Sequence, residues 1–197
     1  KDEPVLQEAF KTAKENKVKL HFLGLVSDGG VHAHINHIKG LVRAAKLAEV
    51  PDVYVHGFTD GRDVDPKSGA GFIEELQESC AANNAQIASV VGRYYAMDRD
   101  KRWERVKKTY DLLVHGKGKS TTDFVEAMKD SYANGTTDEF IEPLVGVGID
   151  NQPLATIQAG DVVVFFNFRT DRGRQLTQVL HQQDFGDYDM KKQDLYF

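Results

Sequence analysis

The apolar positions of the chain follow two different spacings, and their alternation predicts the fold. Short continuous apolar runs are typical of buried strands, whereas apolar residues three and four positions apart are typical of one buried helix face. Runs of the first kind cover residues 18–26, 53–58, 86–91 and 161–166. Helical spacing covers residues 5–13, 34–49, 72–80, 103–113 and about 122–132, and a last helix is expected after Arg172, ending near His181. Strands that alternate with helices predict an α/β fold with a doubly wound, mostly parallel sheet and helices on both faces.

The pattern loosens between residues 120 and 160. The apolar segments near 140–147 and 154–157 are short and broken, so we expect a small irregular or antiparallel appendage there. The whole chain, residues 1–197, is interpreted as a single α/β domain. Lys1 is not a usual first residue, and residues 193–197 resemble the beginning of a strand. We therefore expect a fragment of a longer protein.

Composition narrows the class of protein. The 197 residues are 41% hydrophobic and 28% charged, which is typical of a globular domain with its own core. No apolar run approaches the roughly 20 residues of a membrane-spanning helix, and no signal peptide is visible. Cys80 is the single cysteine, which excludes an intrachain disulfide and fits a reducing, cytoplasmic location. The formal net charge of −5 argues against a nucleic-acid partner.

Basic side chains follow four of the predicted strands. Because the carboxyl ends of parallel strands meet at one edge of a sheet, these side chains should lie close together. Arginine carries a permanent charge on a planar fork that matches carboxylate and phosphate oxygens. One such loop alone is commonly only a solvated ion pair, but four loops at one edge predict a pocket for a small, multiply anionic ligand. The basic residues are His32, Arg62, Arg93, Arg99, Arg169 and Arg172, with Asp63 beside Arg62.

The turn after the first strand, residues 27–34 (SDGGVHAH), permits a second interpretation. Its two glycines allow a tight turn, and Asp28, His32 and His34 could bind zinc together with Asp60 and Asp98, as in a metal-dependent hydrolase. A capping or packed histidine is the commoner outcome of such an H-x-H pattern. Phosphate loops of the G-x-x-x-x-G-K-[ST] type, G-x-G-x-x-G and the G-x-S-x-G nucleophile elbow are absent from the sequence.

Four motifs together resemble one known family. They are LVSDGGVHAH at residues 25–34, GFTDGRD at 57–63, GRYYAMDRDKRW at 92–103 and NFRTDR at 167–172. In this order and spacing they resemble the cofactor-independent (2,3-bisphosphoglycerate-independent) phosphoglycerate mutases, from about His21 to the end of the chain. Thr170 stands where that family's last motif usually has proline, and both neighbouring arginines are retained.

The resemblance implies a two-domain enzyme of which this chain is one part. Such mutases have a phosphatase-like domain with a serine nucleophile and two Mn²⁺ ions, and an inserted transferase domain that holds the glycerate. The serine takes the phosphoryl group and returns it to the other hydroxyl, so that the isomerase interconverts 3-phosphoglycerate and 2-phosphoglycerate in glycolysis. The chain resembles the transferase domain only. The family's serine and metal ligands match nothing in it, so we expect no bound metal and no activity from this chain alone.

The resemblance also implies roles for individual residues. Asp63 would be catalytic and exchange protons with the glycerate hydroxyls. The substrate would be bound by His32, Arg62, Asp63, Arg93, Arg99, Arg169 and Arg172. The convergence of the loops, independently of the resemblance, predicts that replacing Arg169 or Arg172 in the full-length enzyme weakens binding or turnover about tenfold or more and changes fold stability little. A non-catalytic module that binds phosphorylated metabolites remains a third interpretation, alongside the hydrolase.

Overall fold

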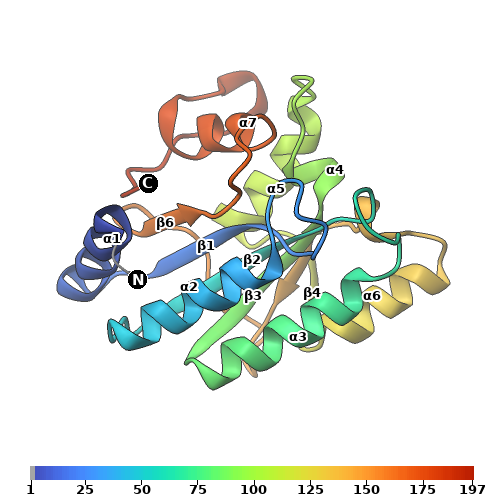
Figure 1. Ribbon diagram of the computed structural model, residues 1–197. Helices are drawn as coiled ribbons and strands as arrows, with labels where there is room; N and C mark the ends of the chain where they lie inside the picture. Colours follow the sequence, from blue (N-terminus) through green and yellow to red (C-terminus); the bar gives the residue numbers. More distant parts are fainter. Residues whose placement is uncertain (1–2) are drawn as a thin grey trace.

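The computed structural model describes residues 3–197 and shows one mixed sheet between two layers of helices (Figure 1). The six strands lie in the order β4-β5-β3-β2-β1-β6. Every neighbouring pair is parallel except β3 with β5. Their bounds are β1 Leu20–Leu25, β2 Val53–Thr59, β3 Ala85–Gly92, β4 Lys119–Thr121, β5 Leu144–Gly146 and β6 Val162–Phe165. This arrangement confirms the predicted α/β class and the mostly parallel sheet.

The helices lie on both faces of the sheet. On one face α2, α3 and α6 lie side by side, and on the other α4, α5 and α7 cover the sheet, while α1 lies near β6 (Figure 1). Within residues 3–197, no helix combines the length and apolar composition needed to cross a membrane. The α-helices are α1 Pro4–Asn16, α2 Ile35–Leu47, α3 Gly69–Ala82, α4 Arg93–Ala96, α5 Trp103–His115, α6 Phe124–Ala133 and α7 Arg174–Thr177. Single helical turns cover Asp138–Phe140, Gln178–Gln182 and Gly186–Tyr188.

Local chemistry explains where several helices begin and end. The His34 side chain accepts a hydrogen bond from the backbone of Asn36 and caps the start of α2. Asp123 caps α6 in the same way through the backbone N–H of Glu126. Gly116, in a left-handed conformation with φ 64°, ends α5, because a residue without a Cβ adopts this conformation at little cost. The helix expected up to about His181 consists of α7 and a π-helical turn.

The segment expected to form an irregular or antiparallel appendage contains β5, which pairs with β3 in antiparallel fashion, and an antiparallel bridge between Val147 and Pro153. It is not separate from the rest of the fold, because β5 and β4 extend the edge of the main sheet beyond β3. The turn at Asp138–Phe140 lies in the same segment. It packs beside the carboxyl ends of β2 and β3, where Thr59 donates a hydrogen bond of 2.7 Å to the Asp138 carbonyl. This segment therefore supplies one wall of the site described below.

A chain of buried polar groups crosses the middle of the sheet. Ser89 Oγ lies 2.7 Å from His56 Nδ1, His56 Nε2 lies 3.0 Å from His21 Nδ1, and His21 Nε2 lies 3.1 Å from Asp161. Asp161 also pairs with Lys19 at 2.8 Å. If both imidazoles are neutral, each hydrogen bond has one donor and one acceptor. Burial is the main cause that lowers the pKa of both histidines below the ordinary value.

This polar chain predicts a fold that weakens in mild acid. The unfolded chain binds protons on His21 and His56 near pH 6.5, whereas the folded chain resists protonation, so acid favours unfolding. The free energy of unfolding should be constant above about pH 7 and should fall by roughly 1.4 kcal/mol per pH unit for each proton taken up below about pH 6.5. Urea unfolding between pH 8 and pH 5 measures this effect.

A His32→Gln variant is the matched control, because His32 also has a lowered pKa but lies outside the polar chain. The pH dependence should persist in this variant. A free energy of unfolding that stays flat down to pH 5 would contradict neutral, buried imidazoles in the sheet.

Candidate functional site

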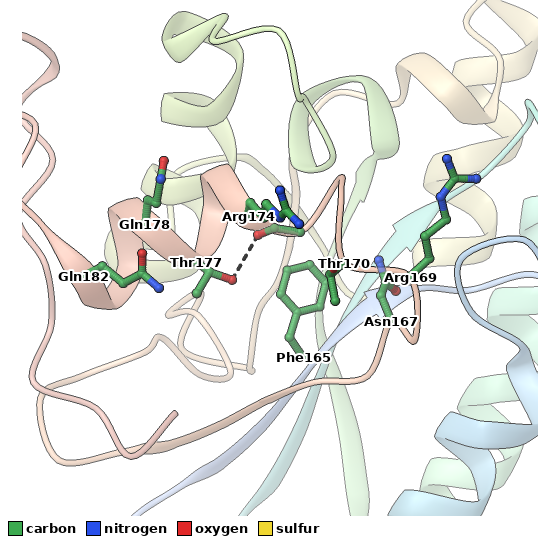
Figure 2. A pocket seen from close by; sticks show the side chains of 9 residues that line it. Phe165, Asn167, Arg169, Thr170, Arg174, Thr177, Gln178 and Gln182 are labelled. Carbon is green, nitrogen blue, oxygen red and sulfur yellow. Dashed lines mark hydrogen bonds between the residues drawn. The ribbon is translucent and has the colours of Figure 1, made fainter.

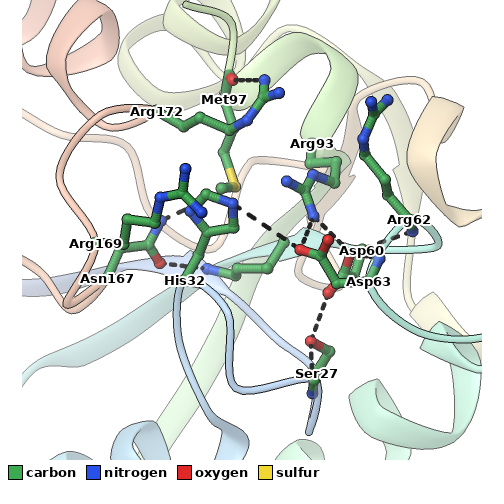
Figure 3. Close-up of polar contacts among 12 residues, drawn as sticks. Ser27, His32, Asp60, Arg62, Asp63, Arg93, Met97, Asn167, Arg169 and Arg172 are labelled. Carbon is green, nitrogen blue, oxygen red and sulfur yellow. Dashed lines mark hydrogen bonds and ion pairs between the residues drawn. The ribbon is translucent and has the colours of Figure 1, made fainter.

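The loops that follow β1, β2, β3 and β6 meet at one edge of the sheet, and their basic side chains face one another there (Figure 3). Arg62, Arg93, Arg99 and Arg172 line a cavity of about 300 Å³ together with the turn at Asp138–Phe140. Arg169 belongs to the lining of a second pocket, of about 410 Å³ beside α7, but its guanidinium points away from α7 (Figure 2). The five predicted arginines therefore lie at one edge of the sheet, where Arg99 and Arg169 pair with the same carboxylate, that of Asp171.

The loop after β1 is hydrogen-bonded to the loop after β6. This loop turns tightly at Gly30, which has a left-handed conformation with φ 67°. The His32 carbonyl accepts hydrogen bonds of 2.9 Å from Phe168 N and 3.4 Å from Arg169 N, both in the loop after β6. The His32 side chain is buried and 3% exposed. His32 thus fixes the relative position of two loops and presents its ring between them.

Asp60 organises the loop after β2. Its carboxylate accepts hydrogen bonds from Ser27 Oγ at 2.7 Å, from Arg62 N at 3.2 Å and from Asp63 N at 3.0 Å. Aspartate side chains commonly bind backbone N–H groups two and three residues ahead in such turns. Gly61 is required here, because a Cβ would come within 2.8 Å of Asp138 and Glu139. These contacts fix the backbone from which the Arg62 and Asp63 side chains extend.

Arg93 is a buried cation with two carboxylate partners. Its Nη1 lies 2.7 Å from Asp60 Oδ1 and 2.6 Å from Asp63 Oδ2. The Arg93 and Asp60 side chains are 3% and 2% exposed, and Asp63 is 20% exposed. Burial alone would raise the pKa of Asp60, but hydrogen bonds from Asp63 N, Ser27 and Arg93 outweigh it and keep the pKa below the ordinary value. Arg93 is consequently part of the fold's internal structure as well as of the cavity wall.

The remaining arginines are more exposed and differ in their partners. Arg62 pairs with Glu139 at 3.3 Å, and Arg99 and Arg169 both pair with Asp171. Arg172 donates a hydrogen bond of 3.1 Å to the Met97 carbonyl and, among the described residues, has no carboxylate within ion-pair distance. Its pKa is lowered by burial and then by the charges of Arg99, Arg93 and Arg62. Arg172 therefore carries the least compensated positive charge of the cavity.

The His32 imidazole lies between two acids without a hydrogen bond to either. Nε2 is 3.9 Å from Asp63 Oδ2, and Nδ1 is 3.9 Å from Asp171 Oδ1. Burial and then the charges of Arg93 and Arg169 lower its pKa, against the opposing effect of the two carboxylates. A neutral ring can donate one hydrogen bond to a ligand oxygen and accept another. The positive charge of the site consequently belongs to its arginines.

The residues of the hydrolase interpretation do not form a metal site. His34 is occupied as the cap of α2, and Asp60 is bonded to Arg93 and to its own loop. Asp98 accepts hydrogen bonds from the backbone of Asp100 and Arg102. Within residues 3–197, no three side chains of histidine, cysteine, aspartate and glutamate are arranged to hold a metal ion. The structure gives this interpretation no support.

Sequence reasoning missed several residues at the site. Glu139 and Phe140 come from the turn at the sheet edge, in a segment without a strong pattern, and no sequence signal identified them. Asp171 lies inside the NFRTDR motif between Arg169 and Arg172. Its charge next to Arg172 was the signal that could have drawn attention to it. The sequence suggests Asp60 only as a metal ligand, whereas in the structure it organises the loop after β2.

Comparison of the chain with known proteins finds the same family in each case. The family model described as "BPG-independent PGAM N-terminus" matches residues 1–197. The 2,3-bisphosphoglycerate-independent phosphoglycerate mutase of Flavobacterium johnsoniae is 59% identical over 99% of this chain and 39% of its own length. The enzyme of the same name from Bacteroides fragilis is 56% identical over 92% of this chain and 35% of its own length.

A solved phosphoglycerate mutase structure also matches the fold of the chain. Leishmania mexicana phosphoglycerate mutase, crystallised at low cobalt concentration, matches with a TM-score of 0.89 and 32% identity, over 97% of this chain and 36% of that chain. The chain thus spans less than two fifths of the length of each of these three relatives.

Proposed function

Because the chain belongs to the family of BPG-independent phosphoglycerate mutase N-termini, we propose that it is the glycerate-holding domain of an isomerase that interconverts 3-phosphoglycerate and 2-phosphoglycerate. In this proposal residues 1–197 correspond to the transferase domain, and a phosphatase-like domain completes the enzyme. Glycolysis in the cytoplasm is the corresponding setting. The observation that carries the proposal is the Arg172 guanidinium, which has no carboxylate within ion-pair distance among the described residues and shares its cavity with four further arginines, Arg62, Arg93, Arg99 and Arg105.

The chemistry of the ligand matches this cavity. Both phosphoglycerates have a carboxylate and a phosphate, at opposite ends in 3-phosphoglycerate and on neighbouring carbons in 2-phosphoglycerate. The guanidinium fork binds both kinds of oxygen bidentately. The arginines gathered at this edge of the sheet can hold the two anionic groups of one small molecule. The neutral His32 ring can hydrogen-bond to an oxygen between them. We assign substrate binding to His32, Arg62, Asp63, Arg93, Arg99, Arg169 and Arg172.

Asp63 is the residue that we assign to proton exchange. One carboxylate oxygen is bonded to Arg93 at 2.6 Å, and the side chain remains 20% exposed at the cavity. A carboxylate held in one orientation can take a proton from one glycerate hydroxyl and return it to the other. Asp60 and Ser27 hold the loop that fixes this orientation. Closure of the second domain over the site would exclude water that competes for the phosphoryl group.

We assign the serine nucleophile and the two Mn²⁺ ions to the phosphatase-like domain. Manganese prefers carboxylate, carbonyl and water ligands, whereas five arginines line the cavity of this chain, and two of its three acids, Asp98 and Glu139, are paired with arginines. In this proposal the chain's own residues bind, orient and deprotonate the glycerate and do not contact the metal. The expectation that this chain binds no metal stays a prediction.

The chain alone should be inactive. With excess Mn²⁺ it should convert 3-phosphoglycerate no faster than buffer does, and it should release no inorganic phosphate, because the assigned nucleophile lies outside it. A coupled assay for 2-phosphoglycerate measures the conversion, with a complete mutase of the family as positive control.

Two outcomes would contradict the proposal. Turnover by the pure chain within the range of ordinary enzymes, about 1–10³ s⁻¹, would refute a substrate-holding domain that needs a partner. A complete protein that binds phosphoglycerate without turning it over would instead support the non-catalytic binding module.

A further inference from the structure

Three side chains of the proposed site converge on a carboxylate that the chain itself supplies. Asp171 Oδ1 lies 2.9 Å from Arg169 Nε, and Asp171 Oδ2 lies 3.2 Å from both Arg169 Nη2 and Arg99 Nη1. The buried His32 Nδ1 lies 3.9 Å from Oδ1. An anionic ligand bound at this position would contact the same two guanidinium groups and the same imidazole that surround the Asp171 carboxylate. In this structure Asp171 takes that place.

The carboxylate is held more loosely than the other acids of the site. Charge-assisted hydrogen bonds of this kind are normally about 2.7–2.9 Å long, and two of the three Asp171 contacts are 3.2 Å. Arg93, in contrast, lies 2.6 Å and 2.7 Å from its two carboxylates. The Asp171 side chain is 32% exposed, and Arg99 and Arg169 are each 49% exposed. The surrounding structure therefore leaves the Asp171 carboxylate room to move.

The hydrogen-bonding capacity of this position is also incompletely used. His32 Nδ1 is buried without a hydrogen-bond partner. Asp171 Oδ1 lies 2.9 Å from Arg169 Nε as an ion pair but without the geometry of a hydrogen bond, and it lies 3.9 Å from His32 Nδ1. Buried polar atoms normally have partners, so such a pair marks a position that another group can complete. A ligand oxygen that bonds to His32 and to the arginines would leave fewer polar atoms unsatisfied than Asp171 does.

We propose that Asp171 is an internal counter-ion that occupies an anion position in the ligand-free domain and gives it up to an anionic group of the substrate. While no ligand is bound, the counter-ion keeps Arg99 and Arg169 on the same side of the cavity, although they lie 70 positions apart in the sequence. A small anion such as inorganic phosphate has to compete with a carboxylate tethered in the same loop. The identity of the natural ligand rests on the proposed function, whereas the competition itself does not.

The test is the affinity of inorganic phosphate for the chain with and without this charge. Asp171→Asn keeps the shape of the side chain and removes its charge. At low ionic strength, calorimetric titration should show phosphate binding about tenfold tighter than to the unaltered chain, because a negative charge a few ångströms from the anion is lost. Asp171→Glu keeps the charge and should bind phosphate much as the unaltered chain does. Glu78→Gln, an exposed change on α3, removes one negative charge elsewhere and should have no effect.

A phosphate affinity that does not increase in Asp171→Asn would overturn the proposal. If Asp171→Asn binds phosphate as weakly as the unaltered chain or more weakly, Asp171 only positions the arginines and does not compete with ligands. Absence of phosphate binding in both proteins would overturn it as well. A parallel titration with 3-phosphoglycerate separates this inference from the proposed function. Tighter phosphate binding by Asp171→Asn without any preference for 3-phosphoglycerate would refute the proposed substrate and uphold the counter-ion.

Discussion

Replacing Arg93 with methionine should lower the free energy of unfolding by about 3–5 kcal/mol, the largest stability effect that we expect from any arginine of the site. Arg93 is 3% exposed and is bonded to both Asp60 and Asp63. Removing it leaves a buried carboxylate, Asp60, without its cation, and an uncompensated buried charge is far more costly than a lost surface pair. Urea unfolding at pH 7.5 measures the change.

Arg99→Met is the matched comparison. Arg99 is 49% exposed and pairs with Asp171 at 3.2 Å, so its loss should cost less than about 1 kcal/mol. If Arg93→Met and Arg99→Met unfold at the same urea concentration, Arg93 does not stabilise the loops in the way that its contacts indicate. The expectation of little effect on stability, formed from the sequence for Arg169 and Arg172, does not extend to Arg93.

Arg172→Leu should lower kcat/KM of the complete mutase by about tenfold to a hundredfold. Its guanidinium has no carboxylate partner among the described residues and lies in the cavity with Arg62, Arg93 and Arg99. A hydrogen bond to a charged ligand contributes roughly 1.5–3 kcal/mol, and each 1.4 kcal/mol corresponds to a factor of ten. Initial rates over a range of 3-phosphoglycerate concentrations give kcat and KM separately.

Two further variants make the Arg172 experiment specific. Arg172→Lys should recover only part of the lost activity, because lysine keeps the charge and lacks the planar fork. Arg43→Leu removes an exposed arginine on α2, away from the cavity, and should leave kcat/KM unchanged. Equal losses in Arg172→Leu and Arg43→Leu would indicate that the overall charge of the chain, and not this cavity, determines the activity.

The central part of the fold could be predicted because its signals are local. The strands β1, β2, β3 and β6 are apolar runs bounded by turn residues, and the helices between them have a regular buried face. In contrast, β4 and β5 have three residues each, and Lys119 and Ser120 are exposed. Such short strands carry no periodic pattern, and their place in the sheet depends on pairing with β3 and with each other.

The gathering of the arginines at one edge could also be predicted, because it follows from the parallel order of the strands. Which carboxylate pairs with which arginine could not be predicted from the sequence. The contacts of Arg93 with Asp60, and of Arg99 with Asp171, join residues 33 and 72 positions apart in the sequence. Only the folded geometry shows that Arg93 is neutralised by buried acids while Arg172 is not. The difference between a structural and a ligand-binding arginine therefore had to come from the structure.

The central claim is that the edge formed by the loops after β1, β2, β3 and β6 binds phosphoglycerate. Titration of the chain with 3-phosphoglycerate, followed by the backbone amide NMR signals, tests it most directly. We predict saturable shifts confined to His32, Arg62 and Asp63, residues 93–99 and residues 167–172. A separate groove of about 1050 Å³ lies between α1 and α2, and shifts that gather in this groove, or no saturable shifts at all, would contradict the account.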